Sequence, residues 1–232
     1  MADPYLTATL PQPLPDDPMH WADAWLSKAI EDSVRRNPNS MTLATVDPEG
    51  RPSSRVVLCK RFVPDPGYLV FYTNYNSRKS AELDANPRVS VCFHWDAIGR
   101  QVRLDGIAVV SPAEESDAYF QSRHWGSQLG AWGSDQSEHI VSREALLDQI
   151  RGRARELGIP VSEDLKDLVE PYSETIARPL HWGGYRIWPD SAELWLEGRD
   201  RIHDRARWTR TLDPADEHSF VCGPWAGTRL QP

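Results

Sequence analysis

The spacing of hydrophobic residues changes near residue 40 from a helical period to a strand period. Between Asp17-Pro18 and Asn37-Pro38, the apolar residues recur at helical spacing and predict one helix with an inward stripe made of Trp21, Trp25, Leu26, Ala29, Ile30 and Val34. From residue 41, β-rich runs over 41–46, 54–62 and 68–73 are separated by turns rich in proline, aspartate and glycine. These runs predict an antiparallel meander.

From residue 77 to the C-terminus, the sequence predicts three helices among further strands. A helix is predicted over 77–85, another after the capping box Ser111-Pro112-Ala-Glu114, and a third from Ser142 to Gly158. Strands are predicted over 88–95, 100–110, 184–188, 192–196, 206–211 and 219–222, with a polar loop over 160–180. Within 100–110, Val102 and Leu104 share one face and Gln101 and Arg103 the other. The pattern predicts a mainly β, α+β fold with flanking helices, built as a closed or half-closed barrel.

Composition favours a single domain. The chain has 232 residues, of which 40% are hydrophobic, enough for one full core. Residues 1–18 contain five prolines and little apolar periodicity. We therefore expect a flexible, proline-rich arm over residues 1–18 and one domain over residues 19–232.

Charge and cysteine usage exclude several classes of protein. The net charge of -8 and the absence of a basic stripe argue against nucleic-acid binding. No apolar run approaches the ~18 residues that a membrane span needs, and the N-terminus lacks a secretory signal pattern. The three cysteines lie far apart without metal-site spacing, so we expect reduced thiols, no metal and a cytoplasmic location.

The common sequence signatures of nucleotide binding and hydrolysis are absent. The chain has neither G-x-G-x-x-G nor G-x-x-x-x-G-K-[ST], and it lacks H-E-x-x-H and G-x-S-x-G. Any nucleotide must therefore be bound by scattered side chains rather than by a glycine-rich loop.

Cations occupy rigid segments of this acidic chain. Arg55 and Lys60 fall on a predicted strand, and Arg78 and Lys79 fall at the start of the helix over 77–85, where they oppose the positive end of the helix dipole. An anion bound at that end would make the arrangement favourable. The pattern indicates a small phosphorylated ligand held by point contacts.

Two further groups of polar residues are candidates for anion binding. Tyr119 and Arg123 are four residues apart on a predicted helix, where they could hold an anion or form an ordinary surface pair. Strand alternation would place Arg201, His203 and Arg205 on one side, where the two guanidinium groups favour a neutral imidazole. Such a group suits a phosphate or a ring hydroxylate.

The order of motifs resembles the FMN-dependent pyridoxine/pyridoxamine 5'-phosphate oxidase family. The resemblance runs from about Trp21 to Pro232. It is carried by Arg55-Val-Val-Leu-Cys-Lys60, Phe71-Tyr-Thr-Asn-x-x-Ser-Arg-Lys79, Asn86-Pro-Arg, Arg100-Gln-Val, Tyr119-Phe-x-Ser-Arg123, Gly126-Ser-Gln-x-Gly-Ala-Trp132, Gln136-Ser137, His181-Trp-Gly-Gly-Tyr185 and Arg201-Ile-His-Asp-Arg205.

The resemblance implies a split β-barrel homodimer with FMN at the subunit interface. It implies that the flavin cofactor is bound by Arg55, Lys60, Tyr72, Thr73, Arg78, Lys79, Gln101, Gln136, Ser137, Trp195 and Arg205. It further implies a substrate phosphate cradle of Lys60, Tyr119, Arg123 and Ser127, with Arg201 and His203 as the catalytic residues over the pyridine ring. The implied reaction oxidises pyridoxamine or pyridoxine 5'-phosphate to pyridoxal 5'-phosphate, with dioxygen as acceptor and hydrogen peroxide as product.

The sequence departs from the family pattern at three places near the substrate. Residues 1–18 lack the family's basic, tyrosine-containing segment, His124-Trp125 replaces a proline and a basic residue, and Leu196 replaces a glutamine. A bulky Trp125 could admit another aromatic ring, as in related flavin oxidases of phenazine-type secondary metabolism. A protein that binds flavin or pyridoxal phosphate without turnover is a further alternative.

Overall fold

The computed structural model describes residues 7–160 and 175–232, and the chain separates into two compact units. The first unit holds residues 1–71, 82–110 and 185–232, and the second holds residues 72–81 and 111–184. Strands β4 (Tyr68–Asn74) and β7 (Trp182–Leu196) and helix α2 (Arg78–Ala85) each have residues in both units. The expected division into an arm over 1–18 and a domain over 19–232 stays a prediction.

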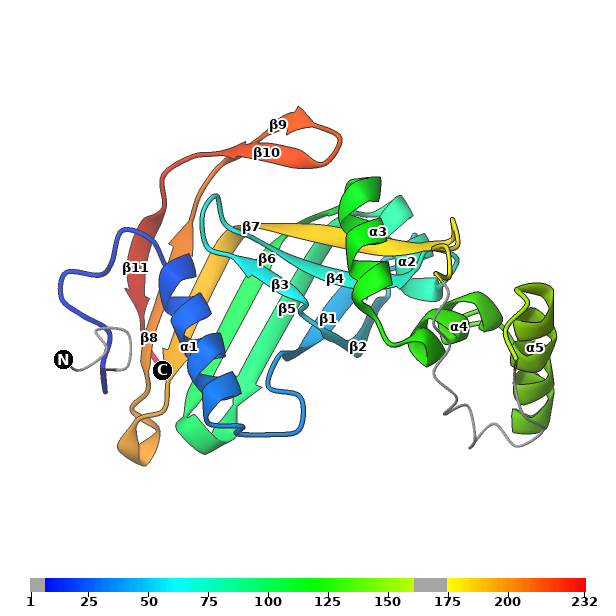
Figure 1. The fold of residues 1–232 in the computed structure, drawn as a ribbon. Helices are drawn as coiled ribbons and strands as arrows, with labels where there is room; N and C mark the ends of the chain where they lie inside the picture. The colour runs from blue at the N-terminus through cyan, green and yellow to red at the C-terminus, as the bar shows by residue number, and fades with distance from the viewer. Residues whose placement is uncertain (1–6, 161–174) are drawn as a thin grey trace. The chain divides into compact units, whose positions relative to one another are not determined.

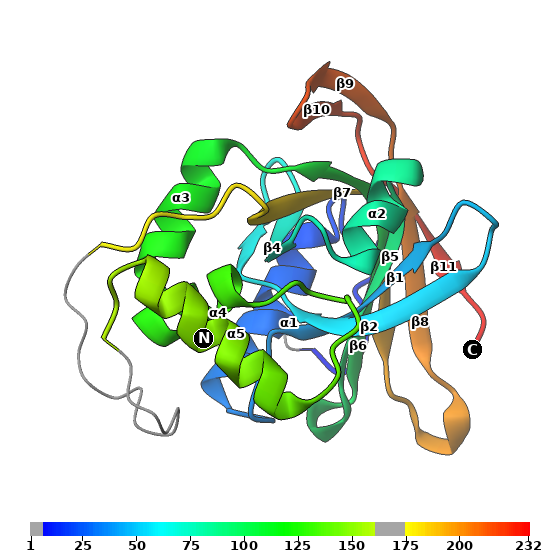
Figure 2. The same ribbon diagram turned by 90° about the vertical axis from the view of Figure 1, so that its right-hand side faces the viewer.

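The first unit contains most of an antiparallel half-barrel sheet (Figure 1). Its other strands are β1 (Ser40–Val46), β2 (Pro52–Leu58), β3 (Arg61–Val63), β5 (Arg88–Trp95), β6 (Arg100–Val110), β8 (Asp204–Thr209) and β11 (Ala226–Leu230). The strand order is β11-β8-β7-β6-β5-β1-β2, and β4 pairs with β3 and β7. A separate hairpin joins β9 (Leu212–Asp216) to β10 (Ser219–Cys222) and projects from the sheet (Figure 2).

Alternation along β6 explains how the sheet forms its core. Val102 and Leu104 are buried, whereas Gln101 and Arg103 are partly exposed, as the sequence predicts. Helix α1 (Met19–Glu31) lies across the sheet and buries Trp21 and Trp25 (Figure 1). Its burial supplies a large apolar contribution to the core.

A bulge in the β6–β7 pair requires a glycine. The register shifts between Asp105 and Gly106, and a Cβ on Gly106 would lie 2.1 Å from the carbonyl oxygen of Trp188. Only glycine permits this close backbone approach.

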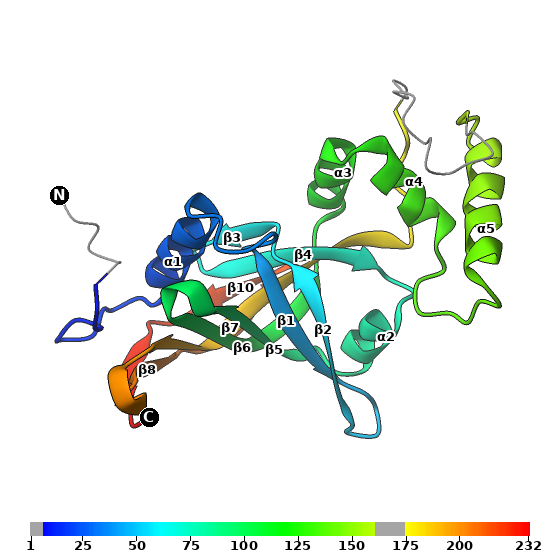
Figure 3. The same cartoon turned by 90° about the horizontal axis from the view of Figure 1, so that it is seen from below.

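The second unit is mainly helical. It contains α3 (Ala113–Ser122), α4 (Trp125–Gly133) and α5 (Arg143–Glu156), which are grouped together in Figure 3. Its core includes Phe120, Leu129, Ala154 and Trp182. Two short 3₁₀ turns, Asp96–Ile98 and η3 (Arg199–Arg201), complete the described elements, and no described helix has the length and apolar character needed to span a bilayer.

The mainly β class with flanking helices is confirmed, but several element predictions are wrong. Helix α1 ends before Val34, and Ile30 is 50% exposed because it lies at the last turn rather than under the sheet. The run over 54–62 is two strands, β2 and β3, and 184–196 is one continuous strand because Pro189 lies beside the bulge. Helix α4 and strands β9 and β11 were not predicted.

The predicted cap of α3 is also wrong, and the predicted loop over 160–180 lies mostly outside the described residues. The Ser111 hydroxyl does not cap α3: its Oγ is buried without a hydrogen-bond partner in the described part of the chain, and Pro112 is the N-cap. Most of the loop expected over 160–180 falls at 161–174, outside the described residues. Within the arm, the Leu10 backbone N–H donates to Asp204 at 2.7 Å.

Candidate functional site: two clusters of cationic side chains

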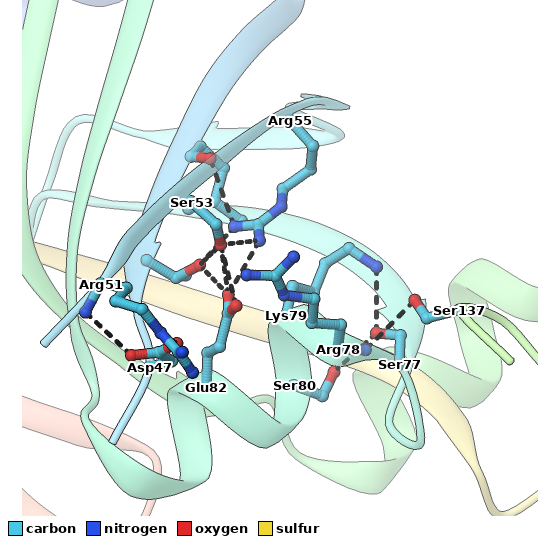
Figure 4. Close-up of polar contacts among 12 residues, drawn as sticks. Asp47, Arg51, Ser53, Arg55, Ser77, Arg78, Lys79, Ser80, Glu82 and Ser137 are labelled. Carbon is cyan, nitrogen blue, oxygen red and sulfur yellow. Dashed lines mark hydrogen bonds and ion pairs between the residues drawn. The ribbon is translucent and has the colours of Figure 1, made fainter. Parts of the chain in front are cut away.

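In the second unit, the start of α2 gathers predicted cofactor residues around the Lys79 ammonium. Lys79 is 9% exposed, and its Nζ donates to Thr73 Oγ1 at 3.0 Å and to Gln136 Oε1 at 2.7 Å. Ser137 Oγ accepts from the Arg78 backbone N–H at 3.2 Å (Figure 4). The structure therefore brings Thr73, Arg78, Lys79, Gln136 and Ser137 together, as the sequence predicts.

The backbone at this place is held in an uncommon conformation. Ser137 has φ of 80°, a region that costs a side-chain-bearing residue energy and is frequent at functional sites. This conformation places the Ser137 hydroxyl at the N-terminus of α2, where the helix dipole and the side chains of Arg78 and Lys79 add positive potential. This combination is chemically suited to a phosphate.

A second cluster in the same unit combines aromatic rings with the Arg123 guanidinium. Tyr72 and Tyr119 stack with ring centroids 3.9 Å apart, and Tyr72 and Trp182 stack at 5.5 Å. The Arg123 Cζ lies 4.5 Å from the Trp182 ring centre, a cation–π distance. Burial lowers the pKa of Arg123, because desolvation disfavours its charged form.

One atom of Arg123 is buried without a partner. Among the described residues, Nη1 has no hydrogen-bond acceptor, although a guanidinium N–H is a strong donor. Leaving such a donor unsatisfied costs free energy, so an anionic ligand that accepts from it would be stabilised.

The predicted helical pairing of Tyr119 and Arg123 is wrong. Helix α3 ends at Ser122, and Arg123 is extended, with ψ of 148°. Ser127, the fourth predicted cradle residue, is exposed on α4, whose N-terminus is capped by His124 Nδ1. The described hydrogen bonds do not link Ser127 to Tyr119 or Arg123.

In the first unit, Arg55 on β2 lies in a buried polar cluster (Figure 4). Its Nη2 donates to Glu82 Oε2 at 2.8 Å and to Ser53 Oγ at 2.6 Å. Lys60 is exposed after β2, and its backbone N–H donates to Val70 at 2.8 Å. Arg55 and Lys60 are thus placed on neighbouring backbone, but only Arg55 is enclosed.

Trp195 on β7 lies beside Gln101 on the neighbouring strand and His203 in the loop before β8. Gln101 is opposite Trp195 in the β6–β7 register, and the His203 ring lies 4.6 Å from the Trp195 ring. The Gly198 backbone N–H donates to His203 Nδ1 at 3.2 Å. A backbone N–H can only donate, so the neutral imidazole carries its proton on Nε2.

Arg205 is bound to a second buried carboxylate in the same unit. Its Nη2 donates to Glu193 Oε1 at 2.8 Å, and Glu193 is 6% exposed. Arg103 approaches the other carboxylate oxygen at 3.6 Å. Glu193 therefore lies between two guanidinium groups.

The expectation that Arg201, His203 and Arg205 alternate on one strand is wrong. Strand β8 begins at Asp204, and Arg201 lies in η3 with φ of 63°. The preceding Asp200 also has positive φ, so the tight turn overrides strand alternation. Arg201 is exposed, whereas His203 is half-buried.

The predicted site did not include Glu82, Glu193, Trp182 or Gly198, although each contacts a predicted site residue. The only signal for Glu193 is an acidic residue inside the apolar run Ala192-Glu-Leu-Trp195. The sequence gives little indication that Glu82 is buried, because acidic residues on a helix are usually exposed to solvent. No group of His, Cys, Asp and Glu among the described residues could hold a metal ion.

Comparison with known proteins gives the same assignment over nearly the whole chain. Residues 26–153 match the family model "Pyridoxamine 5'-phosphate oxidase", and residues 182–232 match "Pyridoxine 5'-phosphate oxidase C-terminal dimerisation region". The pyridoxine/pyridoxamine 5'-phosphate oxidase of Paraburkholderia phytofirmans is 45% identical over 216 residues, covering 93% of this chain and 89% of the relative. That of Rubrobacter xylanophilus is 43% identical over 218 residues, covering 93% and 87%.

Two solved structures share the fold. PhzG from Burkholderia lata, crystallised with tetrahydrophenazine-1-carboxylic acid, superposes with a TM-score of 0.77 at 28% identity, covering 100% of this chain and 98% of that chain. A pyridoxamine 5'-phosphate oxidase-related, FMN-binding protein from Nostoc punctiforme has a TM-score of 0.62 at 18% identity, covering 91% and 97%. The predicted split-barrel fold is thereby confirmed, and the chain belongs to the pyridoxamine 5'-phosphate oxidase family of oxidoreductases.

Proposed function

We propose that the protein oxidises pyridoxamine or pyridoxine 5'-phosphate to pyridoxal 5'-phosphate, with dioxygen as acceptor and hydrogen peroxide as product. The observation that carries the proposal is the buried Nη1 of Arg123, which has no hydrogen-bond partner among the described residues and lies beside stacked aromatic rings. A flat ring that carries an anion satisfies both features. The names of relatives that are 45% and 43% identical support this substrate class.

We propose FMN as the cofactor, held through its phosphate near the N-terminus of α2. The donor set fits, because Arg78, Lys79 and the Ser137 hydroxyl lie together there. We assign Arg55, Lys60, Tyr72, Thr73, Gln101, Gln136, Trp195 and Arg205 as further cofactor residues. When bound, FMN supplies two-electron acceptor chemistry and reactivity with dioxygen, and the protein supplies alignment and charge compensation.

On the substrate side, we assign the phosphate to Lys60, Tyr119, Arg123 and Ser127. Arg123 is held by its stacking on Trp182, so its N–H groups keep one direction. This fixed orientation reduces the conformational entropy lost when an anion binds.

We assign Arg201 and His203 to the substrate ring. Because Gly198 donates to Nδ1, the neutral His203 presents an Nε2–H donor, which suits a ring oxygen or another acceptor. The tilted contact of the His203 ring with the Trp195 ring restricts the rotation of His203. His203 would therefore orient the ring and stabilise negative charge on it, rather than remove a proton through Nε2.

We propose a cytoplasmic homodimer with FMN at the subunit interface. The support for assembly is the match of residues 182–232 to a dimerisation region. The support for the compartment is chemical, since Cys59, Cys92 and Cys222 are all free thiols. Sedimentation of the purified protein as a monomer that still binds FMN would contradict the interface.

A second candidate is oxidation of a dihydroaromatic carboxylate. It is favoured by the superposition on PhzG with its tetrahydrophenazine ligand, and by Trp125 at the start of α4. A carboxylate could accept from Arg123 as a phosphate does. The two candidates differ in ring and anion, not in the residue that binds the anion.

Anaerobic bleaching of the flavin absorption distinguishes the candidates. We expect pyridoxamine 5'-phosphate to bleach a yellow, FMN-containing protein, and unphosphorylated pyridoxamine to do so more than tenfold less efficiently, because a charge-assisted contact of about 1.5 kcal/mol is lost. Bleaching by a dihydrophenazine carboxylate but by neither phosphorylated vitamer would replace the first candidate by the second. A colourless protein that takes up no FMN would exclude both.

A further inference from the structure

The Glu82 carboxylate is the centre of a buried polar cluster in the first unit. Glu82 is 3% exposed on α2, and both of its oxygens accept from Ser53 Oγ, at 2.9 and 2.7 Å. Oε2 also accepts from the Thr45 hydroxyl and from Arg55 Nη2 (Figure 4). These donors satisfy the buried carboxylate oxygens of Glu82, so its burial leaves no polar atom of the side chain unpaired.

The same cluster occupies most of the donors of Arg55. Nη2 donates to Ser53 and Glu82, while Nη1 donates to Thr45 Oγ1 and, at 3.4 Å, to the Leu43 carbonyl. A guanidinium has five N–H donors, so the described contacts use the four on Nη1 and Nη2 and leave the one on Nε for a ligand. Arg55 is therefore held rigidly and its charge is balanced by Glu82.

We propose that Glu82 is a positioning residue of the cofactor site, which fixes the Arg55 guanidinium so that it meets the FMN phosphate in one orientation. The proposal rests on the FMN assignment of the proposed function. Its physical basis is conformational entropy. An arginine side chain loses rotational freedom about several bonds when it binds a ligand, and a partner that orders the side chain beforehand removes that entropic cost from binding. Glu82 acts through Arg55 and contacts no ligand itself.

The hydrogen bond between Glu82 and Arg55 predicts how substitutions of Glu82 affect the guanidinium. Glu82→Ala removes the acceptor for Ser53, Thr45 and Arg55 and frees the guanidinium. Glu82→Gln keeps the size and one carbonyl oxygen for Arg55, and its amide can donate to the hydroxyl of Ser53 or Thr45. The orientation of Arg55 is thus retained in Glu82→Gln, although the negative charge is lost.

An ion pair in the turn between β1 and β2 provides a matched control. Arg51, in the β1–β2 turn, pairs with Asp47 at 2.7 Å, but its side chain is 71% exposed (Figure 4). Because the Arg51 guanidinium is in solvent, its interaction with Asp47 is screened and contributes little to stability. Arg51→Gln removes a cation from this hairpin without touching the Glu82 cluster, so any general effect of charge is measured by this variant.

The experiment is the dissociation constant of FMN for the full-length apoprotein, measured by quenching of flavin fluorescence. We expect Arg55→Ala and Glu82→Ala each to bind FMN at least tenfold more weakly than the wild type. The double variant Arg55→Ala/Glu82→Ala should bind no more weakly than either single variant. Arg51→Gln should bind with wild-type affinity. Glu82→Gln should bind within about threefold of the wild type, because orientation is retained, with steeper dependence on salt, because the guanidinium charge is unbalanced.

The outcomes separate this proposal from the FMN assignment. Wild-type protein that binds no FMN ends the proposed function and this proposal together. If the wild type binds FMN and Arg55→Ala weakens it, but Glu82→Ala and Glu82→Gln bind as the wild type does, then Glu82 does not position Arg55. Additive losses in the double variant contradict action through Arg55. If Glu82→Ala does not fold, Glu82→Gln still tests the proposal. A loss of FMN affinity in Glu82→Gln as large as in Arg55→Ala overturns the proposal, because it would show that the charge of Glu82 matters rather than the orientation of Arg55.

Discussion

Arg205 in the first unit and Arg123 in the second unit are both partly enclosed, yet their surroundings differ in kind. Arg205 is bound to the buried Glu193, and Arg55 to the buried Glu82. Arg123 lies over Trp182, and its Nη1 is buried without a partner among the described residues. The difference teaches that a buried carboxylate orients the guanidinium and balances its charge in Arg55 and Arg205, whereas no described carboxylate does so for Arg123, whose Nη1 remains available to an anionic ligand.

The largest expected effect is on stability and concerns Glu193. Glu193→Ala leaves Arg205 without its carboxylate in a site where the Arg205 side chain is 25% exposed. We expect the free energy of unfolding to fall by about 3 kcal/mol, the lower end for breaking a buried pair, because Arg205 keeps some contact with water. Urea denaturation measures the change.

The surface pair Arg153–Glu156 provides the control for this variant. Its side chains are 44% and 64% exposed, so Glu156→Ala should change stability by less than ~1 kcal/mol. In addition, Arg205→Ala combined with Glu193→Ala should be less destabilising than Glu193→Ala alone. Equal losses from Glu193→Ala and Glu156→Ala would mean that enclosure does not distinguish the two pairs.

A smaller loss is expected at Gly198, which fixes the hydrogen bond to His203. A Cβ at this position would lie 1.7 Å from the Ile202 carbonyl oxygen, so Gly198→Ala must displace the loop. We expect a loss of about 1–3 kcal/mol, as for other overpacked sites, together with a changed nitrogen NMR signature of His203. Retention of the unprotonated Nδ1 signal at wild-type stability would contradict the role of this loop.

Gly152 is the matched control for Gly198. It lies inside α5, and a Cβ there would meet nothing within 4 Å. Gly152→Ala should therefore stabilise the protein by about 0.5–1 kcal/mol through helix propensity, measured in the same urea titrations. The opposite signs at the two glycines would show that close approach, and not glycine content, governs the effect.

The smallest expected stability effect is at Arg123. Arg123→Gln removes a cation–π contact but leaves no unpaired carboxylate behind among the described residues. We expect a change under ~1 kcal/mol in the free energy of unfolding, far below that of Glu193→Ala. A loss as large as 3 kcal/mol would place Arg123 in the same structural class as Arg205 and remove the contrast.

The elements that the sequence predicts are those that depend on interactions between residues close together in the chain. The alternation in β6 and the helix α2 depend on near neighbours, and both were predicted. Helix α4 was missed because Trp125–Gly133 contains three glycines and is stabilised by packing of Leu129 in the core of the second unit. The turn at Asp200 and Arg201 was missed because its positive φ values occur at residues that rarely adopt them.

The candidate site follows the same rule. The motif order predicted the group around Lys79, whose members lie on β4, α2 and the segment after α4. The carboxylates that hold Arg55 and Arg205 could not be predicted, because Glu82 and Glu193 meet these arginines only after the sheet has formed. Burial of a charge depends on tertiary packing, and residue spacing does not report it.

The most direct test of the account is the preference for a phosphorylated substrate in the wild type and in Arg123→Gln. We predict that wild-type kcat/KM is more than tenfold higher for pyridoxamine 5'-phosphate than for pyridoxamine, and that Arg123→Gln reduces this ratio to within about threefold, because the charge-assisted contact of at least ~1.5 kcal/mol is lost only with the phosphorylated substrate. An Arg123→Gln enzyme that keeps the full wild-type preference would contradict the claim that Arg123 binds the substrate anion.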